Sequence, residues 1–510
     1  MGLRDPRSLV LIGSLALACD RGASTDADPK PTVEREAPQA DPQKQPQTDP
    51  QTDPVDINHE TTAKQIVAWI DAGEHAKVRE LFDDAMNKAI PSDDTLAAMW
   101  TAIEAQFGQY RQQLGTTVEQ KDPYTIALVT CAFEKSPMDV RVVFDAGDRL
   151  AGLQVTPSQS VEAYGERPQT PKPPFPYTEE EVRYPNAAGG IEIGGTLTLP
   201  SGAGPHPAVL LITGSGPQDR DETLFGHKPF AVIADRLTRD GIAVLRVDDR
   251  GVGKTTGDPA TATIEDHATD VEAGLAFLAA RSDIDGKRIG LIGHSEGGVI
   301  APMVAARSSQ VAFIVSLAGP GVSGAALNPM QVRALLEAGG GAKEVIHEIV
   351  AGQTELMALL VADAPEEQLA EAVKKLALVA VKLQPGAKPD DLDAAKAVAR
   401  EMVPLLSPWF RSWAKTDPAV HLAKLEIPIL VMIGDKDLQV PADPNLAAID
   451  AALAGKANVR TEKLPGLNHL FQTAKIGTME EYVTLSETFA PAALDMLAQW
   501  VVETASKESP

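Results

Sequence analysis

The chain has 510 residues, of which 44% are hydrophobic, and a formal net charge of −25 at pH 7. This length exceeds one ordinary domain, so we expect two or three folded units with a sizeable core. The acidic balance, without any basic stripe, excludes nucleic acids as partners and excludes anionic membrane surfaces as direct electrostatic partners.

Residues 1–18 have the composition of an export signal. Arg4 and Arg7 precede an apolar run of about ten residues, too short to span a bilayer, and small residues lead into Cys19. The segment resembles a bacterial lipoprotein signal. The resemblance implies export to the cell envelope, cleavage before Cys19 and a lipid anchor on its sulfur, on the periplasmic side or at the outer surface. An ordinary signal peptide with an incidental cysteine is the alternative.

Residues 19–58 contain little that could form a core, because Pro, Asp, Gln and Thr dominate. We expect a disordered, extended tether that could hold a folded domain away from a membrane. Cys131 is the remaining cysteine, and its apolar surroundings at 126–133 predict a buried strand position. No intramolecular disulfide can form if Cys19 is acylated.

Residues 59–156 change from helical spacing to strand patterns, which predicts a small α+β domain. The order of elements resembles the cone-shaped, nuclear-transport-factor-like domains that precede some hydrolases, and both a binding role and a packing role are open. Residues 157–178 form a linker to a larger domain at 179–508. The expected helices lie at 63–70, 78–89 and 93–107, and the expected strands at 115–120, 124–134, 138–145 and 149–155.

A serine between two glycines is the most informative pattern in the larger domain. The aliphatic run 287–292 is typical of a buried parallel strand, and a helical pattern begins at Gly297. A serine on such a turn has strained dihedral angles, so the positions of Gly293 and Gly297 must be small. The pattern predicts a nucleophile elbow at Ser295, with the Glu296 N–H as an oxyanion donor.

Candidates for an acid and a base follow the serine in the chain. A buried-strand pattern at 427–434 leads into Asp435 and Asp437, and a later strand at 459–464 leads to His469. His469 is the only histidine beyond Asp437, so it is the candidate base if the order serine, acid, histidine applies. We expect the earlier histidines to be structural. Spacing alone does not choose between the two aspartates.

The region from roughly 180 to 505 resembles the serine esterases of the α/β-hydrolase family, in the branch of dienelactone hydrolases and prolyl oligopeptidases. The family's G-x-x-D-x-x-V-P pattern matches 434–441 with Asp437 as the acid. Four motifs in the family's order carry the resemblance: 213–221, 249–253, the elbow and 464–471.

The resemblance implies an α/β fold with a doubly wound, mostly parallel sheet and a Ser295, Asp437 and His469 triad. Ser295 would attack an acyl carbonyl, His469 would transfer the proton, and Asp437 would orient the imidazole. A second oxyanion donor should follow the strand at 208–212, where we favour the Ser215 N–H over that of Gly216. Such a reaction needs no metal and no cofactor.

A long helical segment separates the strand at 312–318 from the strand at 427–434. We expect a lid insert at about 320–425, with three or more helices between 331 and 402. Trp409 and Phe410, with Trp413, are candidates for the wall of an acyl pocket, and core packing is the alternative.

The sequence at 251–255 ends like a phosphate-binding loop. Asp248 stands where that motif requires its first glycine, and its charge would repel a phosphate. We therefore expect the segment 249–251 to support the active-site loops.

These observations predict a serine hydrolase that cleaves small-molecule carboxylic esters of short to medium acyl chains through an acyl-enzyme. A serine peptidase, an acyl-peptide hydrolase and a thioesterase are the catalytic alternatives, because the same triad cleaves amides and thioesters. No propeller-sized domain of repeated strands precedes the hydrolase region, which disfavours the peptidase. A non-catalytic binding protein on a hydrolase fold is the alternative from another class.

Overall fold

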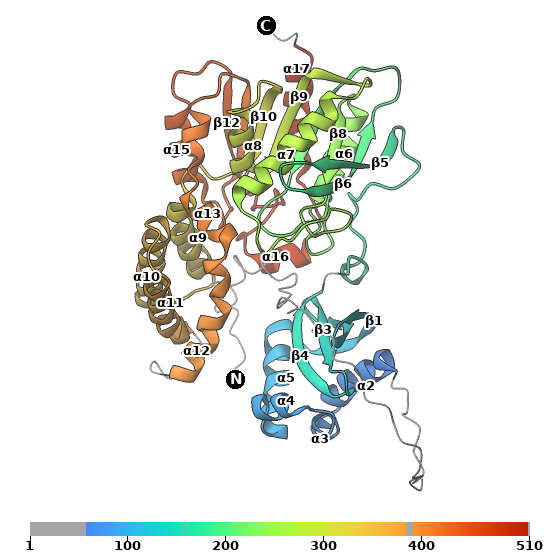
Figure 1. The fold of residues 1–510 in the computed structure, drawn as a ribbon, viewed down its shortest axis with the longest axis vertical. Coiled ribbons are helices and arrows are strands. Elements are labelled where there is room, and N and C mark those ends of the chain that lie inside the picture. Colours follow the sequence, from blue (N-terminus) through green and yellow to red (C-terminus); the bar gives the residue numbers. More distant parts are fainter. Residues whose placement is uncertain (1–57, 159, 384–390, 508–510) are drawn as a thin grey trace, which may run out of the picture.

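The computed structural model describes residues 58–507 except 159 and 384–390, and it contains a small domain followed by a larger one (Figure 1). The predicted export signal and Cys19, with nearly all of the predicted tether, lie outside the described residues. Within the described ranges, no helix has both the length and the apolar character that crossing a bilayer requires.

The small domain consists of helices followed by a four-stranded antiparallel sheet of order β1-β2-β3-β4. Its buried core includes Ile66, Trp100 and the free cysteine Cys131, as predicted for that strand position. The elements are α2 (His59–Asp71), α3 (His75–Arg79), α4 (Asp84–Ala89), α5 (Asp93–Phe107), β1 (Tyr110–Lys121), β2 (Tyr124–Phe133), β3 (Pro137–Phe144) and β4 (Leu150–Pro157).

The prediction of one continuous helix at 78–89 is wrong, because the helix is interrupted between α3 and α4. The Asp83 side chain accepts the N–H of Met86 at 2.6 Å, which caps a new helix start. Phe82, fully buried, forms a β-bridge with Leu150 at the break. Burial of this ring therefore takes precedence over the helical periodicity.

The larger domain is built on an eight-stranded mixed sheet of order β12-β11-β10-β9-β7-β8-β6-β5. Neighbouring strands are parallel from β12 at one edge as far as β8. Beyond β8, strand β6 pairs antiparallel with both β8 and β5. The strands are β5 (Thr178–Asn186), β6 (Ile191–Leu199), β7 (His206–Ile212), β8 (Ala243–Val247), β9 (Ile284–His294), β10 (Val311–Leu317), β11 (Ile429–Gly434) and β12 (Val459–Leu464).

Helices cover both faces of this sheet, which explains its continuous apolar strands. Along β7, Leu210 and Ile212 join one apolar cluster, whereas Val209 and Leu211 join the other. The first cluster includes residues of α7 (Ile264–Ala279), α8 (Gly297–Ala305) and α15 (Ala442–Ala452), and the second includes residues of α6 (Pro229–Arg239) and α17 (Pro491–Ala505).

A helical insert separates β10 from β11, where the sequence predicts a lid. Its described residues form α9 (Gly324–Ala338), α10 (Lys343–Val361), α11 (Glu366–Ala380), α12 (Leu392–Glu401), α13 (Pro408–Lys415) and α14 (Pro418–Leu422). These helices project beside the sheet (Figure 1) and share its first apolar cluster. The insert is therefore packed against the sheet domain by apolar burial.

The turn at 251–255 holds a carboxylate of the chain itself. The Lys254 N–H donates to Asp248 Oδ2 at 2.9 Å, and the Arg220 guanidinium bonds the same oxygen at 2.6 Å. A Cβ at Gly253 would lie 2.3 Å from this oxygen. Asp248 thus occupies the space that a phosphate-binding loop would leave for its ligand.

Candidate active site

Ser295 lies on a sharp turn between β9 and α8 and has a φ of +52°. A Cβ at Gly293 would lie 2.0 Å from the Gly297 oxygen, and a Cβ at Gly297 would lie 2.3 Å from the Ile212 oxygen. The Ser295 N–H donates to the Leu317 oxygen at 2.8 Å, which fixes the turn to the end of β10. Only glycine fits at the two flanking positions, so the local geometry is that of a nucleophile elbow.

The structure brings Asp437 and His469 together from the loops that follow β11 and β12. Asp437 Oδ2 is 2.8 Å from His469 Nδ1, and both side chains are buried. Asp437 Oδ1 accepts the N–H groups of Gln439 and Val440, both at 2.8 Å. These two bonds orient the carboxylate, so that its other oxygen is available to hold the imidazole through Nδ1.

Asp435, which spacing alone leaves as a candidate, has a different partner. Its Oδ1 accepts the N–H of Gly466 at 2.6 Å. This bond braces the loop that leads to His469, and Asp435 makes no hydrogen bond to the imidazole.

Ser295 and His469 line one pocket, whose empty volume is about 900 Å³ including its open mouth. Ser215 and Glu296 also line it, so the predicted nucleophile, base and oxyanion donors share one cavity. The insert contributes further lining residues: Pro320, Leu327, Gln331, Trp409 and Trp413.

Trp409 lines the pocket, but the prediction that Phe410 does so needs correction. Phe410 is fully buried in the apolar core, whereas Trp413 faces the pocket. Residues four apart share a face of a helix, so α13 presents Trp409 and Trp413 together and turns Phe410 away. The two indole rings are stacked, with centroids 6.0 Å apart.

The turn after β7 offers backbone donors beside Ser295. The Gly214 N–H is occupied, since it donates to Glu222 Oε1 at 2.7 Å. In this part of the described structure, the N–H groups of Ser215, Gly216 and Glu296 donate to no protein acceptor. Ser215 and its alternative Gly216 therefore both remain candidates for the second oxyanion donor, with Glu296 as the first.

Glu222 and His294 form a buried pair that connects three segments of the site. His294 Nδ1 lies 2.8 Å from the same Glu222 oxygen that binds the Gly214 N–H, and His294 Nε2 lies 3.0 Å from the His469 carbonyl oxygen. A carbonyl oxygen only accepts, so Nε2 carries a proton. Burial favours a lower pKa for His294, but the Glu222 carboxylate outweighs this effect and raises the pKa.

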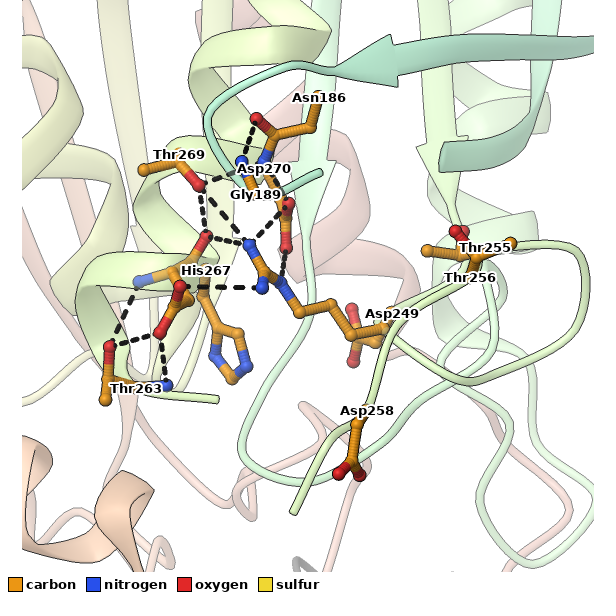
Figure 2. Close-up of polar contacts among 12 residues, drawn as sticks. Asn186, Gly189, Asp249, Thr255, Thr256, Asp258, Thr263, His267, Thr269 and Asp270 are labelled. Atoms are coloured by element: carbon orange, nitrogen blue, oxygen red, sulfur yellow. Dashed lines mark hydrogen bonds and ion pairs between the residues drawn. The ribbon is translucent and has the colours of Figure 1, made fainter. Parts of the chain in front are cut away.

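Glu296, which is buried, and His267, which is partly buried, form a second pair on the other side of Ser295. Glu296 Oε1 lies 2.8 Å from His267 Nδ1, and Glu296 Oε2 accepts the Trp409 Nε1–H at 2.9 Å. A capping box at Thr263 fixes the start of α7 and so places His267 one turn later. Nearby, Thr269 and Asp270 each accept hydrogen bonds from both Asn186 and Arg250 (Figure 2).

Asp249 supports the turn after β7, as the sequence predicts for its segment. It accepts the Thr213 hydroxyl at 2.8 Å and the Gln218 N–H at 2.9 Å. Burial raises its pKa to about 7. Glu222 and His267 cannot be found from the sequence, because each bonds a residue far away in the chain and no local motif marks either one.

Asp437→Asn should slow labelling of Ser295 by a fluorophosphonate by several orders of magnitude, because an amide at this position holds the imidazole in the wrong tautomer. Asp435→Asn, the matched control, should slow it less than about tenfold, since it weakens only a loop contact. Labelling rates are compared after thermal melts show both variants folded. A larger loss in Asp435→Asn would contradict the assignment.

Glu222→Gln should destabilise the protein in a pH-dependent manner. The raised pKa of His294 means that its protonation stabilises the folded state fully below the unfolded-state pKa of about 6.5, and that this contribution is lost as the pH rises through the folded-state pKa. The difference in unfolding free energy between the variant and the wild type should thus be largest below about pH 6.5 and should become smaller as the pH rises through the folded-state pKa of His294. Denaturant titrations at several pH values measure it. A difference in unfolding free energy that does not change with pH would refute the charged pair. The variant His294→Gln should show the same pH dependence as Glu222→Gln.

Comparisons with known proteins agree with this architecture. The model of the "Alpha/beta hydrolase family" matches residues 209–475, more than half of the chain, and the model "Protein of unknown function (DUF3887)" matches residues 63–153. Esterase EstD of Thermotoga maritima is 27% identical over 432 residues, which cover 83% of this chain and 92% of that protein.

Solved structures that match part of this chain include the alpha/beta hydrolase GrgF from Penicillium sp. sh18 and the Pyrococcus furiosus esterase PF2001. GrgF has 17% identity and a TM-score of 0.40, covering 65% of this chain and all of its own. The Pyrococcus esterase has 16% identity and a TM-score of 0.35, covering 57% of this chain and 83% of its own. On the family match over residues 209–475, the chain belongs to the alpha/beta hydrolase family.

Proposed function

We propose that the protein is a serine esterase that cleaves carboxylic esters through an acyl-enzyme. The observation that carries the proposal is the bonded Asp437–His469 pair, whose histidine lines one pocket with Ser295 at its strained turn. The similarity to Esterase EstD, which extends over most of both chains, supports an ester as the substrate.

In the first half-reaction, Ser295 Oγ attacks the ester carbonyl carbon while His469 Nε2 accepts the hydroxyl proton. The carbonyl oxygen becomes an oxyanion, which the N–H groups of Glu296 and Ser215 stabilise. The C–O bond to the alcohol then breaks, and the alcohol leaves with the proton from His469. Asp437 remains ionised and stabilises the imidazolium.

In the second half-reaction, water replaces the alcohol. His469 accepts a proton from the water as its oxygen attacks the acyl carbon, and the second oxyanion occupies the same donors. Collapse of this intermediate breaks the bond to Ser295 Oγ, which takes back the proton, and the carboxylic acid leaves.

The pocket favours neutral acyl groups of short to medium length. Its lining residues in the described structure include no lysine and no arginine, so an anionic acyl group would find no counter-charge. Its two carboxylates, Glu222 and Glu296, are each paired with a histidine. Trp409 and Trp413 limit the space for a longer chain, because each further methylene gains about 0.8 kcal/mol only while room remains.

The cellular location that we propose rests on the sequence alone. The charged start, short apolar run and small residues before Cys19 are features of a lipoprotein signal. We infer that the mature enzyme is exported to the cell envelope and anchored through lipid on Cys19. A lipoprotein cysteine carries several acyl chains, and more than one is needed for firm attachment.

Ser295→Ala should abolish fluorophosphonate labelling and lower ester turnover by several orders of magnitude, because only binding and the oxyanion donors then remain. His469→Ala should cause a similar loss, and the double variant should lose no more than either single one.

The wild type should cleave p-nitrophenyl acetate and butyrate with higher kcat/KM than the palmitate, a peptide p-nitroanilide or a thioester. Full labelling of Ser295→Ala would disprove the nucleophile. A rate rising steadily to palmitate would indicate a lipase, and a faster anilide or thioester would indicate a peptidase or a thioesterase.

Cys19→Ser should remove the lipidation site, so that the protein is found in the soluble fraction or stays as an unprocessed precursor. Expression in a bacterial host, with membrane fractionation and intact-mass measurement of the mature N-terminus, tests this. Cys131→Ser, a buried cysteine in the small domain, is the control and should leave the membrane fraction unchanged. Membrane association that survives Cys19→Ser would contradict the lipid anchor.

A further inference from the structure

The residue that follows the predicted nucleophile has a side chain whose position the elbow motif does not explain. Glu296 is only 3% exposed, and a buried carboxylate is costly unless it is paired and hydrogen-bonded. Each of its two oxygens has one partner: His267 on α7 and Trp409 on α13. The carboxylate therefore connects a helix of the sheet domain to a helix of the insert.

His267 supplies the charge that makes a carboxylate tolerable at this point. Burial favours a lower pKa for His267, but its bond to Glu296 and the nearby carboxylates of Asp249 and Asp270 raise the pKa. A protonated His267 balances the negative charge of Glu296. The balance matters because the N–H of Glu296 faces the predicted oxyanion, which an uncompensated carboxylate on the same residue would oppose.

Trp409 receives its orientation from the same carboxylate. The indole stacks on Trp413 and lines the pocket, and its N–H points at Glu296 Oε2. Stacking leaves an indole free to slide, whereas a hydrogen bond to a carboxylate fixes one edge of the ring. The ring is thus held at a set position relative to the backbone N–H of Glu296.

We propose that the Glu296 carboxylate is a positioning residue that fixes Trp409 as the wall of the acyl pocket and thereby sets the preference for acyl length. The proposal rests on the proposed esterase function. One residue then supplies the oxyanion donor through its backbone and positions the acyl wall through its side chain. Glu296 alone therefore sets the distance between the carbonyl group of the bound ester and the Trp409 ring.

Trp409→Phe keeps an aromatic wall and removes the N–H, and Glu296→Ala removes the acceptor. In each variant the ratio of kcat/KM for the octanoyl over the acetyl ester should rise by about tenfold, the range expected for one hydrogen bond to a charged group. The double variant should show the same ratio as either single variant, because both remove one interaction. Glu296→Gln retains an acceptor and should restore most of the wild-type ratio.

Ser412→Ala is the matched control. Ser412 Oγ accepts the Ile264 N–H at 3.0 Å and donates to the Trp409 carbonyl oxygen at 2.8 Å, so Ser412→Ala disturbs the α13–α7 contact and the backbone at Trp409 while leaving the indole N–H bond to Glu296 in place. This variant should leave the acyl ratio within about twofold of wild type. A ratio that rises as much in Ser412→Ala as in Trp409→Phe would show general loosening of the insert and would overturn the proposal.

The indole N–H signals provide a readout that does not depend on turnover. The chain has five tryptophans, so a ¹⁵N-indole spectrum is simple, and Trp409→Phe identifies the Trp409 signal. That signal should shift in Glu296→Ala and should stay in place in Ser412→Ala. An unmoved signal, an unchanged acyl ratio or additive effects would overturn the positioning role. A folded wild type that cleaves no ester would instead overturn the proposed function.

Discussion

The left-handed backbone at Ser295 is the constraint on which the rest of the site depends. A non-glycine residue persists with a positive φ only where its surroundings determine it, and here the neighbours on both sides are fixed. His294 is bonded to Glu222 and Glu296 to His267, both at 2.8 Å, the same separation as in the Asp437–His469 pair. Three histidine–carboxylate pairs thus converge on one turn, and two of them include a residue adjacent to the serine.

These pairs use directional bonds where apolar packing would be insufficient. Burial of apolar area is non-directional and tolerates small displacements, whereas an oxyanion donor displaced by an ångström loses much of its effect. The turn after β7 illustrates this point. Glu222 holds the Gly214 N–H, and Asp249 holds the Thr213 hydroxyl and the Gln218 N–H. Both ends of the turn that offers the second donor are therefore fixed by carboxylates.

The features that the sequence predicts correctly are local in the chain. The elbow follows from three positions within five residues, and the parallel strands follow from short aliphatic runs. The choice between Asp435 and Asp437 needed a family pattern, because both follow β11 and only the loop's path decides which one reaches His469. The structure places Phe410 in the core, the alternative that the sequence leaves open, because one short segment does not reveal the phase that α13 takes from its start at Pro408. The prediction of a continuous helix at 78–89 is wrong because Phe82 pairs with Leu150, which lies far away in the chain.

The pairs with Glu222 and His267 could not be predicted for the same reason. His294 lies 72 residues from Glu222, and Glu296 lies 29 residues from His267. Glu222 and His267 belong to no spaced motif, so only the fold brings them to His294 and Glu296. Distant polar pairs of this kind depend on topology, which local periodicity does not encode.

The segment that joins the two domains holds another part of the pocket wall. Arg167 donates to the carbonyl oxygens of Leu485 and Phe225 at 2.6 and 2.8 Å, and these residues lie close in the chain to the pocket-lining Tyr482 and Leu224. The buried guanidinium thereby holds the segment at Phe225 against the end of α16 (Met479–Thr484). The shape of the pocket therefore depends on the bond between Trp409 of the insert and Glu296, and on the bonds that Arg167 of the linker donates. Its dimensions depend on a few polar contacts, although most of the buried area around it is apolar.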